Sequence, residues 1–171
     1  NAYQKLPMAS TTKIMTAIVA IEECDVKETV TIPKQACGIE GSSVYLEEGE
    51  KLTVEQLLYG LMLRSGNDCA VALALHIGGS VEGFVKMMND KAQAIGAYNT
   101  HFANPHGLHD DSHYTTAYDL ALISSYAMKN SLFRQIVSTK KIEIPCTTRD
   151  YGRILYNKNK MLSRYEGATG I

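Results

Sequence analysis

The sequence lacks the features that mark a nucleic-acid-binding or a membrane-spanning protein. Its 17 basic and 18 acidic residues nearly cancel, and no run of like charge or basic stripe is present that would displace counterions from a nucleic-acid backbone. The longest mostly apolar run, residues 57–77, is interrupted by the polar stretch from Arg64 to Asp68 and predicts no membrane span. No signal peptide is recognisable. We therefore expect no nucleic acid among the partners.

Paired cysteines and domain linkers are also lacking. The cysteines form no C-x-x-C motif, which argues against a zinc or redox motif, and Cys24 and Cys69 fall in apolar helical patterns typical of buried free thiols. No Pro/Gly/Ser-rich linker, internal repeat or low-complexity segment divides the chain, so we expect residues 1–171 to form one domain. A chain of 171 residues buries roughly two-thirds of its unfolded surface, so its core needs neither metal nor disulfides.

What the sequence does contain is a strong helical pattern. Ile14, Ala17, Ile18 and Ile21 recur at helical spacing, which predicts a mostly buried first helix that ends near Cys24. Capping and glycine signals predict further helices over 54–64, 68–77, 81–95, 117–130 and 132–137. Strand signals are short and fall at 29–32, 42–46, 140–146 and 153–157, with a turn at 47–52.

The first stretch that carries chemistry is "MASTTKIMTA", residues 8–17. A serine hydroxyl is a poor nucleophile until a base takes its proton, and i, i+3 spacing on a helix brings the Lys13 amine near the Ser10 oxygen. The positive end of the helix dipole and partial burial both disfavour the protonated amine, so we expect Lys13 to act as a base. N–H groups of the first turn can also face an oxyanion on the Ser10 side. The alternative is that Ser10 is an N-cap and Lys13 a solvated side chain.

The second stretch is "LRSGNDCA", residues 63–70, where polar residues interrupt two apolar helical segments. Ser65 offers a hydroxyl that can relay a proton between a lysine and a leaving group. Asn67 offers an amide that can hold a substrate carbonyl or the lysine. The alternative makes Asn67 the N-cap of the next helix and places Ser65 and Gly66 in a turn. Either motif alone is weak, but the two together favour a catalytic interpretation.

S-x-x-K at residues 10–13 and S-G-N at residues 65–67 resemble two of the three signatures of the serine penicillin-binding protein and β-lactamase superfamily. The resemblance is to its D-alanyl-D-alanine carboxypeptidases, and "LLYGLMLRSGNDCAVALA", "FVKMMNDKAQAIGAYNTHFANPHGL" and "HYTTAYDLALIS" extend it over nearly the whole chain. S-G-N in place of S-D-N argues against a class A β-lactamase. The resemblance implies an α+β fold of the β-lactamase/DD-peptidase type, of which this chain holds mainly the helical region with short strands.

Carried over to this sequence, the resemblance implies a role for each matching residue. Ser10 would be the acylated nucleophile, its N–H would form half of the oxyanion hole, and Lys13 would be its general base. Ser65 would assist proton transfer to the departing D-alanine, and Asn67 would help to hold Lys13 and the substrate amide. The implied activity is that of a serine-type D-Ala-D-Ala carboxypeptidase acting on peptidoglycan stem peptides, with no cofactor.

The same resemblance implies partners and a location. Peptidoglycan peptides ending in D-Ala-D-Ala would be substrates, and β-lactams would acylate Ser10 as covalent inhibitors. The full-length form would be membrane-associated, at the outer face of the bacterial cytoplasmic membrane. Two alternatives stay open: a β-lactamase of the same superfamily, and a non-catalytic domain that binds penicillin or peptidoglycan as a sensor.

The sequence departs from the family pattern in its third motif. K-T-G is absent, although "GATGI" at 167–171 resembles the segment that leads into it, and only nine residues stand before Ser10, where the family has its first strands. The missing lysine and strand would bind the substrate carboxylate and supply the second oxyanion N–H. We therefore expect a truncated catalytic domain that lacks most of the antiparallel sheet, and a fragment that is a poor enzyme by itself.

A histidine-rich loop invites a metal interpretation that its spacing does not support. It fits neither H-E-x-x-H nor a Cys/His zinc pattern, and it is rich in turn-forming residues. We therefore predict no metal site. The residues concerned are His101, His106, His109, Asp110, Asp111 and His113.

Overall fold

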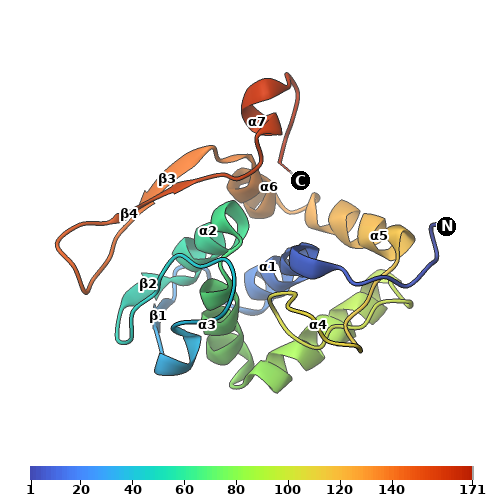
Figure 1. Cartoon of the computed structure of the whole chain (residues 1–171), viewed down its shortest axis with the longest axis horizontal. Coiled ribbons are helices and arrows are strands. Elements are labelled where there is room, and N and C mark those ends of the chain that lie inside the picture. The colour runs from blue at the N-terminus through green and yellow to red at the C-terminus, as the bar shows by residue number, and fades with distance from the viewer. Residues whose placement is uncertain (171) are drawn as a thin grey trace.

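The computed structural model of the protein describes residues 1–170, which are mainly helical (Figure 1). The α-helices are α1 (Thr12–Glu23), α2 (Val54–Arg64), α3 (Asn67–Gly78), α4 (Val81–Ile95), α5 (Ala117–Ala127), α6 (Ser131–Ser138) and α7 (Met161–Arg164). The 3₁₀ turns are η1 (Ala9–Thr11) and η2 (Lys34–Ala36), and the strands are β1 (Thr29–Thr31), β2 (Lys51–Thr53), β3 (Lys141–Ile144) and β4 (Arg153–Tyr156). Strands β1 and β2 pair antiparallel, as do β3 and β4. The predicted helix-rich chain with short strands is confirmed.

Helix α1 lies at the centre of the helical body because it is apolar on nearly every face (Figure 1). Met15, Ala17, Val19 and Ala20 are completely buried. The helix packs against α2, α3, α4, α5 and α6. Because burying one large aliphatic side chain stabilises a fold by roughly 1.5–3 kcal/mol, α1 is a rigid base for whatever its first turn carries. The predicted buried first helix is confirmed, and Cys24 is its C-cap.

The other helices begin where the sequence places capping residues. Thr53 and Gln56 form a reciprocal capping box at the start of α2. The side-chain oxygens of Ser80 and Thr116 cap α4 and α5. These local signals are sufficient because each cap pairs groups within one turn of the chain. Helix α5 ends at Ala127 rather than at residue 130.

Residues 42–46 do not form a strand, contrary to the sequence prediction. The carboxylate of Asp68 accepts hydrogen bonds from the N–H of Val44, at 3.1 and 3.2 Å, and from the N–H of Leu46 at 3.1 Å. These N–H groups are the donors that a neighbouring strand would need. A fully buried acidic side chain therefore holds the segment as a loop.

The β3–β4 hairpin lies beside α2 and extends away from the helical body (Figure 1). Its predicted strands are neighbours, with Ile142 opposite Leu155. Leu155 is buried, and β4 packs against α2. Arg149 in the loop that joins the strands and Arg153 at the start of β4 contact residues 45–51, so the loop end of the hairpin is fastened to that segment.

No single helix among residues 1–170 is both long enough and apolar enough to cross a bilayer. Helices α3 and α4 reach that length and composition only when taken together, and the chain bends by 88° between them.

Candidate active site

Ser10 and Lys13 lie at the junction between η1 and α1. Ser10 is in the 3₁₀ turn and is exposed, whereas Lys13 belongs to the first turn of α1. The Lys13 Nζ donates a hydrogen bond to Ser10 Oγ at 3.3 Å. Thr11, not Ser10, is the N-cap of α1, and its side chain makes no cap hydrogen bond. The predicted juxtaposition is present, and Ser10 is not the N-cap that the alternative required.

Lys13 is a buried amine among neutral hydrogen-bond acceptors. The residue is 2% exposed, and its Nζ also donates to the backbone oxygen of His106 at 2.6 Å. Burial, followed by the nearby charge of Lys158, lowers the pKa of Lys13 to about 8. The charges of Cys69 and Asp68 act in the opposite direction. The alternative of a solvated Lys13 side chain is therefore wrong, and the amine is neutral in an appreciable fraction of molecules near pH 7.

Residues 103–108 hold the start of α1 through backbone oxygens and a glycine. Thr16 Oγ1 donates to Pro105 O at 2.6 Å, one turn beyond the contact between Lys13 and His106. Gly107 has φ +91°, and a Cβ at this position would lie 1.9 Å from the backbone oxygen of Ala9. No side chain fits here. The loop therefore approaches the turn that carries Ser10 backbone to backbone.

A hydrogen-bonded chain runs from His113 to the residue before Ser10. The backbone N–H of Ala103 donates to His113 Nδ1 at 3.0 Å, which leaves the proton on Nε2. That Nε2 lies 2.6 Å from Thr12 Oγ1 and donates to it, and Thr12 in turn donates to Ala9 O at 2.7 Å. Burial lowers the pKa of His113, in keeping with a neutral ring. Ala9 has φ +46°, a strained conformation for a residue with a side chain.

These contacts were not anticipated from the sequence. The sequence pattern of the histidine-rich loop predicts no positioning role for His106 or His113. The one local signal was the pair of hydroxyl residues, Thr12 and Thr16, on the face of an otherwise apolar helix. Both are 0% exposed, so each had to have a buried partner.

The S-G-N motif lies where α2 ends and α3 begins. Ser65 is the C-cap of α2 in the left-handed conformation, with φ +60°. Asn67 is the first residue of α3, and Gly66, not Asn67, is its N-cap. The Asn67 amide donates to Glu40 O at 2.6 Å, so it holds the preceding loop. Within residues 1–170, Lys13 has hydrogen bonds to Ser10 and His106 and none to Asn67.

Lys158 approaches the same region from the segment after β4. Its backbone N–H donates to Leu63 O at 3.1 Å, and its Nζ donates to Ser42 Oγ at 3.0 Å. It is the charge that, after burial, lowers the pKa of Lys13 most. No local sequence pattern indicates this lysine, because 145 positions separate Lys158 from Lys13.

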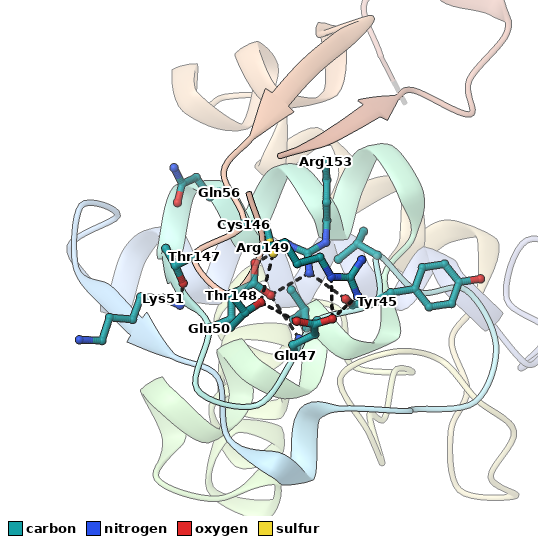
Figure 2. Close-up of polar contacts among 12 residues, drawn as sticks. Tyr45, Glu47, Glu50, Lys51, Gln56, Cys146, Thr147, Thr148, Arg149 and Arg153 are labelled. Carbon is teal, nitrogen blue, oxygen red and sulfur yellow. Dashed lines mark hydrogen bonds and ion pairs between the residues drawn. The ribbon is translucent and has the colours of Figure 1, made fainter. Parts of the chain in front are cut away.

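The segment of residues 45–51, which precedes α2, is fastened to the β3–β4 hairpin by ion pairs (Figure 2). Arg153 forms an ion pair with the fully buried carboxylate of Glu50, and its Nη2 also donates to Tyr45 O at 2.8 Å. Arg149 pairs with Glu47. Tyr45 has φ +61°, and its 76% exposed ring points away from this cluster (Figure 2). The hairpin thereby fixes the backbone that leads toward Ser42 and Ser43.

S-x-x-K thus lies at the start of the central helix α1, and S-G-N lies at the junction of α2 and α3, two helices that both pack against α1. A family model described as D-alanyl-D-alanine carboxypeptidase matches residues 1–171. The chain belongs to the D-alanyl-D-alanine carboxypeptidase family.

Curated relatives carry the same family name. D-alanyl-D-alanine carboxypeptidase DacF of Bacillus subtilis is 37% identical over 176 residues, which cover 100% of this chain and 45% of DacF. The D-alanyl-D-alanine carboxypeptidase of a Streptomyces strain is 40% identical over 95% of this chain and 61% of its own length. The chain thus spans about half the length of these D-alanyl-D-alanine carboxypeptidases.

Solved structures of the family share the fold. A D-alanyl-D-alanine carboxypeptidase from Mycobacterium tuberculosis superimposes with a TM-score of 0.94 and 37% identity, covering 99% of this chain and 64% of that one. A Streptomyces DD-transpeptidase superimposes with a TM-score of 0.92 and 39% identity, covering 99% and 71%. The fold predicted from the resemblance to D-alanyl-D-alanine carboxypeptidases is therefore confirmed.

Proposed function

We propose that the protein is a serine-type D-Ala-D-Ala carboxypeptidase that removes the terminal D-alanine from peptidoglycan stem peptides through an acyl-enzyme on Ser10. One observation carries the proposal: the buried amine of Lys13 lies 3.3 Å from the Ser10 hydroxyl. Burial and the charge of Lys158 lower the pKa of this amine to about 8. Such an amine is neutral often enough to accept a proton and basic enough to hold it.

In this proposal the Ser10 proton passes to Lys13 as the Ser10 oxygen bonds to the carbonyl carbon of the penultimate D-alanine. The peptide bond to the terminal D-alanine then breaks, and its nitrogen takes a proton that Ser65 relays from Lys13. The Ser10 N–H stabilises the oxyanion, and Asn67 holds the substrate amide. Water then hydrolyses the ester and restores the Ser10 hydroxyl.

Partners and location follow from the same proposal. The names of the relatives support peptidoglycan peptides ending in D-Ala-D-Ala as substrates and a place in the bacterial cell envelope. β-Lactams would acylate Ser10 and block it. We also propose that the full-length protein is membrane-associated and works at the outer face of the cytoplasmic membrane.

Mass spectrometry of the full-length protein after incubation with penicillin tests the proposed nucleophile and base. We expect a penicilloyl adduct on Ser10 that forms at least about 10²-fold more slowly in Lys13→Ala, because removing a general base costs roughly 10²–10⁴-fold. Lys86→Ala is the matched control, since Lys86 is exposed and paired with Asp90 at 2.5 Å. The control should label at the parental rate. An adduct on another residue, or an unchanged rate in Lys13→Ala, would overturn the proposal.

Release of D-alanine by the full-length protein separates this function from its alternatives. Slow turnover of bound penicillin together with release of D-alanine from an acyl-D-Ala-D-Ala peptide supports the carboxypeptidase. Rapid hydrolysis of a chromogenic cephalosporin would instead identify a β-lactamase. Durable labelling with no peptide turnover would identify a penicillin-binding sensor.

A further inference from the structure

A second group of reactive side chains gathers at the opposite end of α1 from Ser10. Cys24, Glu28 and His76 each offer one ligand atom, and these atoms all lie within 4.8 Å of one another. Because α1 has 12 residues, this group lies about 18 Å along the helix from the turn that carries Ser10. The group takes no part in the proposed peptidase chemistry.

Helix ends and backbone hydrogen bonds hold the backbone near all three residues. Cys24 is the C-cap of α1, and the turn that follows closes through a hydrogen bond from Glu28 N to Asp25 O at 2.9 Å. Glu28 O then accepts from Val54 N at 3.0 Å, at the start of α2. His76 is in the last turn of α3. Sites built on such elements hold their ligands more precisely than sites on free loops.

The separation of the ligand atoms suits a tetrahedral cation. His76 Nε2 lies 3.3 Å from Glu28 Oε2. Nitrogen and oxygen ligands of one tetrahedral Zn²⁺ are about 3.3 Å apart when each bond is about 2.0–2.1 Å. The sulfur of Cys24 lies within 4.8 Å of both atoms, compared with roughly 3.5 Å for a zinc–sulfur bond of about 2.3 Å, so the side chains have to close in when the ion binds.

The chemistry of the donor set selects the metal. One thiolate, one imidazole and one carboxylate suit zinc, whereas calcium and magnesium prefer oxygen ligands alone. The side chains of His76 and Glu28 are 27% and 53% exposed, so an ion and one water can reach them. Burial, followed by the neighbouring Glu28, raises the pKa of Cys24 to about 11, so the ion has to displace the thiol proton into solvent.

We propose that the protein binds one Zn²⁺ through Cys24 Sγ, the Glu28 carboxylate and His76 Nε2, with water as the fourth ligand. The ion would join the end of α1 to the end of α3. This proposal departs from the expectation of no metal, which was drawn from the histidine-rich loop. Cys24 and Glu28 lie within one short segment, but His76 is 48 positions beyond Glu28, so the three match no linear metal motif. The inference is independent of the proposed peptidase function.

Cobalt titration of the purified, reduced protein tests the site. We expect one Co²⁺ per chain, with the visible spectrum of a tetrahedral site and a thiolate-to-cobalt charge-transfer band. Cys24→Ser should abolish that band, and both Cys24→Ser and His76→Gln should weaken binding at least about tenfold. Cys37→Ser and His109→Gln are matched controls, a second partly buried thiol and an exposed histidine paired with Asp111, and should leave binding unchanged.

A measurement on the unaltered protein guards against variants that do not fold. Zn²⁺ should slow the alkylation of Cys24 by iodoacetamide at least about tenfold and leave that of Cys37 unchanged, as read by peptide mass spectrometry. Equal alkylation of Cys24 with and without Zn²⁺, or an octahedral cobalt spectrum, would overturn the proposal. Neither result would alter penicillin labelling of Ser10, so failure here is distinguishable from failure of the proposed function.

Discussion

Lys13 and Arg153 are both cations withdrawn from water, and the protein surrounds them differently. Lys13 donates to two neutral oxygens, Ser10 Oγ and His106 O. Burial and Lys158 lower its pKa to about 8. Arg153, whose side chain is 12% exposed, pairs with the fully buried carboxylate of Glu50. Burial alone would lower the pKa of Arg153, but Glu50 outweighs it and the net shift is upward.

Burial lowers the pKa of both side chains, and of the two only Arg153 has a carboxylate partner that outweighs it. A buried cation facing a carboxylate keeps its charge and joins two segments of chain. A buried cation facing carbonyl and hydroxyl groups gives up its proton more easily and becomes a base. Arg153 therefore fastens the β3–β4 hairpin to the loop of residues 45–51, whereas Lys13 is available for chemistry. Three predictions sharpen this comparison.

The largest expected effect is on stability. Arg153→Met should lower the free energy of unfolding by about 3 kcal/mol, because it leaves the Glu50 carboxylate buried and unpaired. Lys13→Met should lower it by only about 1 kcal/mol, since the acceptors that it leaves without a donor are uncharged. Urea denaturation of the two variants measures both values. Equal losses would contradict the comparison.

The pH dependence of penicillin labelling tests the charge state of Lys13. Labelling needs the neutral amine, so its rate should rise by about tenfold per pH unit below the pKa and level off above about pH 8. An ordinary lysine would give a rise that continues to about pH 10.5. Stopped-flow labelling between pH 6 and 10 distinguishes the two. A flat profile would mean that Lys13 is not the base.

The smallest effect concerns Lys158. Its positive charge lowers the pKa of Lys13, so Lys158→Met should move the midpoint of the labelling profile upward by a fraction of a pH unit. Lys160→Met changes another exposed lysine two positions further along the chain and should leave the midpoint in place. A downward shift in Lys158→Met would show that the electrostatic account is wrong. Added salt should reduce the shift, because Lys158 is exposed.

Contacts between near neighbours in the sequence could be predicted, and distant ones could not. Ser10 and Lys13, like Thr53 and Gln56, lie within one helical turn, and both pairs follow from spacing and residue type. The contact between Lys13 and His106 spans 93 positions. No local pattern indicates that a backbone oxygen of a distant loop will satisfy a buried amine.

The error at residues 42–46 has the same origin. The alternation of "SSVYL" suits a strand, but the N–H groups of Val44 and Leu46 bond to Asp68, which is 24 and 22 positions away. A single buried carboxylate that accepts several backbone hydrogen bonds outweighs a short strand propensity. Asn67 is of a residue type common at helix N-caps, but Gly66 is the N-cap of α3. The Asn67 side-chain amide donates instead to the backbone oxygen of Glu40.

The close approach of Gly107 to Ala9 restricts which residue position 107 can hold. A Cβ at residue 107 would lie 1.9 Å from the Ala9 oxygen, and Ala9 already has φ +46°, which costs a residue with a side chain roughly 1–2 kcal/mol. The turn that carries Ser10 therefore has little freedom to move aside. A single replacement at residue 107 would remove no reactive group and would still displace the turn that carries Ser10, so the position of that hydroxyl depends on a residue that has no side chain at all.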